Sequence, residues 1–358
     1  MIPEYWQGAV EDVVRLAKSA KKAVVRTLCK TAGGHDVIMF EYGKKNNLNR
    51  TANYSSALGA RDVRCYADKT ASTYTPCVFL IGAEHGAEFE GTVAINNLIS
   101  LLETGRDLGG KAHPELLSLA ESINLLLIPC LNVDGRLRVP LRSMVGQDFE
   151  KFRFYAQGTW KDGSLCMYPK CKTVHPIKDS AGFLGGYFND NGVNIVHDNF
   201  FFPMAEETKA LLKVADDYVP DISVHLHGGA NCMQTIFEFA YVPEHIRQSI
   251  IEISRLIAQA SEKKGLGHQF KSLPDSAGIA SGDLPPSFNI QSAFVNINGE
   301  ISFIYESNQG LDLGEEVNGW NNAFTYDEIY AHHLILFEEV FKYAIALKNK
   351  KIKNRGDD

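Results

Sequence analysis

Short apolar runs alternate with amphipathic segments along most of this chain. The apolar runs predict buried strands at residues 36–42, 77–83, 123–131, 221–229 and 301–308. Apolar residues at helical spacing predict helices at residues 8–22, 90–103, 204–218 and 244–264. A last helix follows Thr325, which forms a capping-box pattern with Glu328. This alternation predicts an α/β fold in which a twisted sheet carries helices on both faces.

The chain of 358 residues is long enough for one large domain or two modest ones. The residues that carry candidate chemistry are spread from His85 to Glu306, so a domain boundary between them would divide the site. We therefore expect a single domain over residues 1–358, with the N-terminal helix (1–30) and the basic tail (348–358) peripheral. Two long loops, 136–191 and 268–290, are expected to border the site, because long loops often carry specificity.

Charge and composition narrow the class of partner. The net charge is −7 and the lysines and arginines are dispersed, so nucleic-acid binding is not expected. No apolar run approaches the roughly 20 residues that span a bilayer, so no membrane partner is expected either. The seven cysteines are an odd number, and the first residues do not resemble a secretory signal, which together predict a cytoplasmic protein. The oligomeric state is left open.

Three residues are spaced to hold one metal ion. His85 and Glu88 directly follow the strand at 77–83, and His225 lies near the end of the strand at 221–229. Two histidines and one carboxylate, with a fourth position left for water, are typical of catalytic zinc, so we predict one Zn²⁺ per chain. His227 is expected to point to the opposite face from His225 and to support a ligand rather than bind the metal.

A single carboxylate ends another apolar strand. Glu306 follows the run Ile301–Tyr305, and burying a carboxylate is costly unless it is paired or functional. The strand at 123–131 leads in turn into the polar sequence Asn132-Val133-Asp134-Gly135. These features predict a site built where several strands end.

The order of these motifs resembles the zinc metallocarboxypeptidases of the pancreatic carboxypeptidase type. That family carries His-x-x-Glu after a strand, then Asn-Pro-Asp-Gly, Gly-Val-Asp-x-Asn-Arg, a strand ending in His and a strand ending in the catalytic Glu. The matching positions are His85 and Glu88, 132–135, 192–197, His225 and Glu306, so the resemblance runs from about residue 30 to about residue 345.

The resemblance implies a mixed sheet of about eight strands and a zinc-dependent hydrolase that cleaves a peptide or amide bond. It makes Glu306 the general base. It also implies an arginine that polarises the substrate carbonyl, for which Arg142 is the closest match in position. Arg136 and Arg138 are rivals for this role and candidates for substrate binding.

The sequence departs from the family where substrates are selected. The Asn-Arg pair that holds a terminal carboxylate is replaced by Val196-His197, followed by Asp198, so His197 and Asp198 are predicted to bind substrate. Arg153, Lys161 or Lys172 could supply the missing cation. The family's mobile tyrosine is also missing, since no tyrosine lies between Tyr241 and Tyr305, and we expect Phe288 in that wall.

Three functions fit these patterns. The first is a peptidase that acts on an unusual peptide or amino-acid conjugate. The second is an N-acyl amino acid deacylase resembling aspartoacylase, which would need a closed pocket with an arginine pair beside the zinc. The third is a catalytically silent zinc-binding protein, against which an intact Glu306 argues.

Overall fold

The computed structural model describes residues 1–201, 203–229, 234–237, 242–266, 270–271, 287–312 and 324–355. Its strands are β1 (Val24–Lys30), β2 (Asp36–Tyr42), β3 (Cys77–Gly82), β4 (Asn124–Ile128), β5 (Gly158–Trp160), β6 (Ala181–Leu184), β7 (Ile222–Gly229), β8 (Gln234–Phe237), β9 (Phe270–Lys271) and β10 (Ile301–Asn308). Its α-helices are α1 (Val10–Ser19), α2 (Tyr54–Gly59), α3 (Glu90–Thr104), α4 (Pro114–Glu121), α5 (Val133–Arg138), α6 (Phe149–Gln157), α7 (Glu206–Tyr218), α8 (Glu244–Lys263), α9 (Ile290–Asn298) and α10 (Tyr326–Arg355). Short 3₁₀ helices are η1 (Val63–Cys65), η2 (Lys170–Lys172), η3 (Lys178–Ser180) and η4 (Ile195–His197).

One mixed eight-stranded sheet forms the centre of the molecule. Its strand order is β1-β2-β4-β3-β7-β10-β8-β9, and the four central strands β4, β3, β7 and β10 run parallel. The neighbouring strands β2 and β8 are antiparallel to this central group. The carboxyl ends of β4, β3, β7 and β10 therefore meet at one edge, where open α/β sheets bind their ligands.

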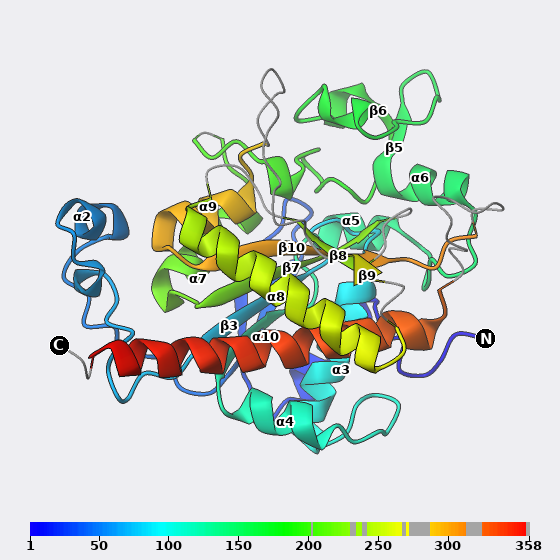
Figure 1. Ribbon diagram of the computed structural model, residues 1–358. Helices are drawn as coiled ribbons and strands as arrows, with labels where there is room; N and C mark the ends of the chain where they lie inside the picture. Colours follow the sequence, from blue (N-terminus) through cyan, green and yellow to red (C-terminus); the bar gives the residue numbers. More distant parts are fainter. Residues whose placement is uncertain are drawn as a thin grey trace.

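Helices cover both faces of this sheet, as predicted. Gly91 of α3 packs directly against Leu226 of β7, since a Cβ built on Gly91 would lie 2.4 Å from the Leu226 Cβ. The preceding residue His225 points to the other face, where its ring lies 5.2 Å from that of Phe294 in α9. In Figure 1, α10 runs along the lower part of the molecule with α3 and α4, while α7 and α9 lie in the upper part. The α/β fold predicted from the sequence is confirmed.

Element boundaries agree where local signals are strong. The helix predicted at 90–103 is α3, which ends at Gly105 because this residue adopts a left-handed conformation with φ of 81°. The capping box at Thr325 is present, since the Thr325 N–H donates to the Glu328 carboxylate and the Glu328 N–H donates to the Thr325 hydroxyl. The edge strand β1 was not predicted, because its exposed side chains give no continuous apolar run.

The segment 136–191 is more ordered than the loop that we predicted. It contains α6 and the small antiparallel pair β5 and β6, together with η2 and η3. Four buried side chains give it a local apolar cluster, namely Cys166, Cys171, Ile177 and Phe188. Most of the second predicted loop, 268–290, lies outside the described residues, as do 356–358 of the basic tail.

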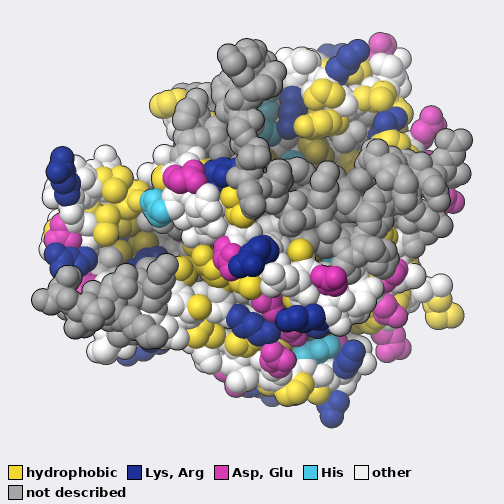
Figure 2. Space-filling view, viewed as in Figure 1, with side chains coloured by type: hydrophobic (Ala, Val, Ile, Leu, Met, Phe, Trp, Pro, Cys, Tyr) yellow, Lys and Arg dark blue, Asp and Glu magenta, His cyan; other side chains and the backbone are white. Residues whose placement is uncertain are grey.

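Two surface properties follow from the described residues. No helix among them combines the length and apolar character that crossing a bilayer requires. On the face shown in Figure 2, basic and acidic side chains are interspersed. This arrangement agrees with the dispersed charge in the sequence.

The loop after β3 is held against α5 at very close range. A Cβ built on Gly86 would lie 2.1 Å from the backbone nitrogen of Arg136, and the Gly86 N–H donates to the Gly186 carbonyl at 2.7 Å. Just before this loop, Ala83 turns the chain with a left-handed φ of 47°. On the α5 side, the Asn132 side chain accepts from the Gly135 N–H at 2.8 Å. The contact between the two segments therefore leaves no room for a side chain at position 86.

We expect Gly86→Ala to lower the free energy of unfolding by about 1–3 kcal/mol, because the added methyl group meets backbone atoms that cannot rotate away. Gly59→Ala is the matched control, since a Cβ there meets nothing within 4 Å. Urea denaturation of both variants checks this expectation. Equal midpoints for the two variants would contradict it.

Candidate metal site

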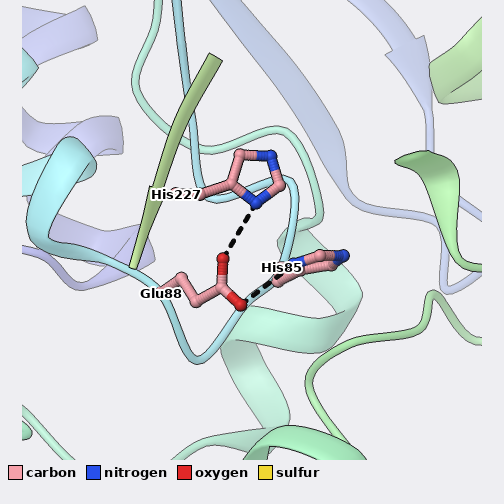
Figure 3. A group of neighbouring side chains, drawn as sticks. All are labelled: His85, Glu88 and His227. Carbon is pink, nitrogen blue, oxygen red and sulfur yellow. Dashed lines mark hydrogen bonds and ion pairs between the residues drawn. The ribbon is translucent and has the colours of Figure 1, made fainter. Parts of the chain in front are cut away.

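Three buried side chains meet at the carboxyl edge of the parallel strands. His85 and Glu88 come from the loop after β3, and His227 comes from β7 (Figure 3). The two carboxylate oxygens of Glu88 each lie 3.0 Å from a histidine, one from Nδ1 of His85 and the other from Nδ1 of His227. The three possible ligand atoms lie within 4.8 Å of one another. This His-Glu-His trio can hold a metal ion.

The outward nitrogens of both histidines have acceptors. Nε2 of His85 lies 3.2 Å from the Asn194 side-chain oxygen, which also accepts the N–H of Val196. Nε2 of His227 lies 2.8 Å from a carboxylate oxygen of Glu84. If each Nε2 carries its proton toward these acceptors, each Nδ1 directs a lone pair toward Glu88. A cation among them would remove the repulsion between these lone pairs and the carboxylate, so the donor set fits zinc.

The local charges favour an ionised Glu88. Burial by itself would raise the pKa of Glu88, but His85 and His227 outweigh it and hold that pKa at about 2. Burial by itself would lower the pKa of His227, but the hydrogen bonds to Glu84 and Glu88 raise it well above its usual value. A bound cation would therefore take the place of the proton on Nδ1, the nitrogen that faces Glu88. The trio thus supplies a permanent negative charge between two nitrogen donors.

The expectation that His225 is the third ligand is corrected by the structure, which groups His227 with His85 and Glu88. Residues two apart in a strand point to the same face, so our expectation of opposite faces was also wrong. β7 extends to Gly229, which places His227 nearer the carboxyl edge and His225 deeper in the sheet. His225 is fully buried and binds Glu84 through Nδ1 at 2.6 Å.

Glu306 lies opposite His227 on the neighbouring strand. The two residues are partners in the parallel register of β10 and β7, and Glu306 is partly exposed. Burial raises the pKa of the Glu306 carboxyl to about 7, and the negative charge of Glu88 adds to the increase. A carboxyl group beside the trio can therefore exchange a proton near neutral pH.

Lys172 and His197 form a pair near the trio, since charged groups of the site act on the pKa values of both. Nζ of Lys172 lies 2.9 Å from Nε2 of His197. Burial lowers the pKa of His197 to about 3, and the charge of Lys172 contributes to the decrease. His197 is therefore neutral at ordinary pH, and Lys172 is the cation of the pair. Burial lowers the pKa of Lys172, whereas the charges of Glu88 and Glu306 act to raise it, so this ammonium group lies within the electrostatic field of the site.

The three predicted arginines lie in different surroundings. Arg136 is buried and donates from all three of its guanidinium nitrogens to backbone carbonyls, those of Gly8, Val139 and Leu141. Arg138 donates to Asp190 and to the backbone carbonyls of Leu184, Gly185 and Phe188. Arg142 is exposed and lines a hollow beside α1 that includes none of the trio. The catalytic role of Arg142 and the substrate-binding roles of Arg136 and Arg138 therefore stay predictions, to which the structure adds the scaffold contacts of Arg136 and Arg138.

Asp198 also supports the backbone. Its two carboxylate oxygens accept the N–H groups of Asn199 at 2.7 Å and Ala205 at 2.8 Å. These bonds shape the segment that leads into α7, and the substrate-binding role of Asp198 stays a prediction. Phe288 is exposed and its ring contacts Phe200.

Three further residues of the site were not predicted from the sequence. Tyr187 stacks on His85 with ring centroids 3.6 Å apart. Asn194 lies within the Gly-Val-Asn motif, whose similarity to the family could have indicated it. Glu84 directly follows the apolar run 77–83 and precedes His85, and a carboxylate after an apolar run is the same signal that indicated Glu306.

Comparison with known proteins supports the architecture. No family model and no curated protein matches the sequence. Among solved structures, a metallo-carboxypeptidase from Burkholderia cenocepacia matches with a TM-score of 0.56 at 12% identity, over 93% of this chain and 68% of that one. Bovine thrombin-activatable fibrinolysis inhibitor, in complex with tick carboxypeptidase inhibitor, matches with a TM-score of 0.56 at 10% identity, over 96% and 99%. The chain has a zinc-carboxypeptidase-like fold.

Carboxypeptidase A from Helicoverpa armigera gives the same result, with a TM-score of 0.52 at 13% identity over 96% of this chain and 74% of that one. At such identities the carboxypeptidase-like similarity establishes the fold alone. The chemistry must be argued from the residues of this chain.

Proposed function

We propose that this carboxypeptidase-like protein is a zinc-dependent hydrolase that cleaves a peptide or amide bond. The observation that supports this most strongly is the His85–Glu88–His227 trio, with Glu306 facing it in strand register. The solved structures with a similar fold are metallocarboxypeptidases, which supports hydrolysis as the reaction of this site. Zinc held by the trio would lower the pKa of a water molecule and polarise the substrate carbonyl.

Glu306 is the general base in this proposal. Its raised pKa, near 7, is matched to proton transfer at neutral pH. The carboxylate form accepts the proton of the attacking water, and the acid form then donates it to the leaving amine. Burial and the charge of Glu88 raise the pKa of Glu306, so Glu306 can exchange a proton at a pH where the ligand carboxylate of Glu88 stays ionised.

Lys172 and His197 form the substrate-binding pair. Neutral His197 holds the Lys172 ammonium group by accepting one of its three N–H bonds, which leaves two donors for an anionic substrate group. We propose that Lys172 binds a free carboxylate of the substrate, while Tyr187 covers one face of His85.

The deacylase alternative is less well supported. It requires an arginine pair beside the metal, and the guanidinium groups of Arg136 and Arg138 are bound to backbone carbonyls. Arg153, another candidate cation, stacks on Phe149 at 3.9 Å. The presence of Glu306 beside the trio likewise argues against a silent zinc-binding protein.

A cytoplasmic location is part of the proposal. The six cysteines among the described residues are Cys29, Cys65, Cys77, Cys130, Cys166 and Cys171, and all are free thiols. Free thiols are typical of reducing compartments.

Metal analysis tests the ligand set. The purified protein should carry about one zinc per chain, whereas His85→Ala and His227→Ala should lose it, because removing one of three ligands removes much of the binding energy. His35→Ala, at an exposed histidine, is the control and should retain zinc. Elemental analysis after dialysis gives the metal content, and circular dichroism checks the fold. Full retention by both ligand variants would refute the site.

Glu306→Gln separates proton transfer from metal binding. The variant should keep its zinc and lose roughly 10²-fold or more in turnover, because an amide cannot accept the proton. Glu300→Gln changes a buried carboxyl group just before the opposite end of β10 and should leave turnover nearly unchanged. Turnover is measured on a library of peptides and acyl-amino acids. Normal turnover by Glu306→Gln would assign the base elsewhere.

Lys172→Met tests substrate recognition. Its kcat/KM on free-acid substrates should fall about 10- to 100-fold, since a hydrogen bond to a charged group contributes about 1.5–3 kcal/mol. Amidated substrates should be cleaved equally by the variant and the wild type. Lys170→Met, in the same 3₁₀ helix, is the control and should behave as wild type. An equal loss on both substrate types would show that Lys172 does not bind the carboxylate.

A further inference from the structure

A fully buried carboxylate lies behind the trio and joins two histidines of the same strand. One oxygen of Glu84 lies 2.6 Å from Nδ1 of His225, and the other lies 2.8 Å from Nε2 of His227. The second oxygen also accepts the Gln291 side-chain N–H at 3.1 Å. Donors from β7 and α9 therefore converge on a carboxylate with no exposed surface.

Such a group requires compensation. An isolated buried carboxylate is strongly destabilising unless it is paired and hydrogen-bonded. Glu84 has this compensation, since His225 and His227 lie within hydrogen-bond distance of its two oxygens and the Gln291 N–H donates to one of them. All three contacts are with side chains that can donate an N–H, so Glu84 serves as a hydrogen-bond acceptor.

This acceptor determines which nitrogen of His227 carries the proton. A proton on Nε2 points to Glu84, so Nδ1 is free to point toward Glu88 and the metal position. The same carboxylate fixes the plane of the His227 ring. A carboxylate in this position also makes the imidazole a stronger electron donor.

His225 completes the arrangement from deeper in the sheet. It gives Glu84 the proton of its other nitrogen, Nδ1, while its Nε2 lies 3.3 Å from the Ser302 hydroxyl of β10. Its ring is packed against Phe294 of α9. The two histidines therefore present opposite nitrogens to one carboxylate, and His225 holds Glu84 in place.

We propose that Glu84 is a positioning residue that tunes metal affinity by fixing His227, and that His225 anchors Glu84. This inference rests on the metal site of the proposed function. It assigns His225, which resembles a ligand in the sequence, to the support of the true ligand.

Zinc affinity, measured by competition with a chelator, tests the proposal without a substrate. Glu84→Ala should weaken zinc binding about 10- to 100-fold, the range found when partners of metal ligands are removed. Glu84→Gln should weaken it less, because the amide oxygen can still accept one N–H. His225→Ala should cause a smaller loss than Glu84→Ala. Glu300→Gln removes a buried carboxyl group far from the trio and should bind zinc as the wild type does.

The visible spectrum of the cobalt-saturated protein separates positioning from mere stability. At full metal occupancy, the Co²⁺ bands of Glu84→Ala and Glu84→Gln should be shifted, while those of Glu300→Gln should match the wild type. If Glu84→Ala does not fold, Glu84→Gln replaces it in both measurements, because glutamine has nearly the same side-chain volume as glutamate. Wild-type affinity and spectra in the folded Glu84 variants would overturn the role of Glu84 alone. A wild-type protein that binds no metal would overturn the proposed function as well.

Discussion

The geometry of the site depends on the register of one strand. β7 lies between β3 and β10, and all three run in the same direction. A slip of one residue in β7 would exchange His227 for Leu226 on the face that carries the trio. Leu226 prevents this slip, because it packs against Gly91 of α3 so closely that the glycine has no space for a side chain. The apolar contact on one face of the sheet thus fixes the polar site on the other.

The same region concentrates negative charge in a buried space. Glu84, Glu88 and Glu306 all lie near His227, yet their environments differ. Glu84 and Glu88 each bind two histidine nitrogens, which keeps their pKa values low. Burial and the charge of Glu88 act on Glu306 in the opposite direction. The arrangement separates carboxylates that remain ionised from one that can exchange a proton, which is the division of roles that hydrolytic chemistry requires.

Much of this architecture could be predicted from local pattern. The four central strands are continuous apolar runs, and each ends where a polar motif begins, so their shared edge follows from the sequence. The choice between His225 and His227 did not follow, because the two residues face the same side and only the full extent of β7 places one nearer the edge. The roles of the arginines were equally hidden. Arg136 and Arg138 bind backbone carbonyls, such as that of Gly8, which no motif in the sequence marks.

The basic side chains near the site differ in what their charged groups bind. Arg138 pairs with Asp190 and donates to several backbone carbonyls, so its guanidinium group stabilises the surrounding backbone. The side-chain hydrogen bond of Lys172 goes instead to a neutral imidazole, which orients the ammonium group without cancelling its charge. An ammonium group also lacks the planar fork of guanidinium and imposes less geometry on a bound anion. Arg136 and Arg138 thus serve the scaffold, while Lys172 keeps its charge near the trio. Under the proposed function, Lys172 would attract an anionic substrate with little demand on its orientation, so the trio and its support would have to set the position of the scissile bond.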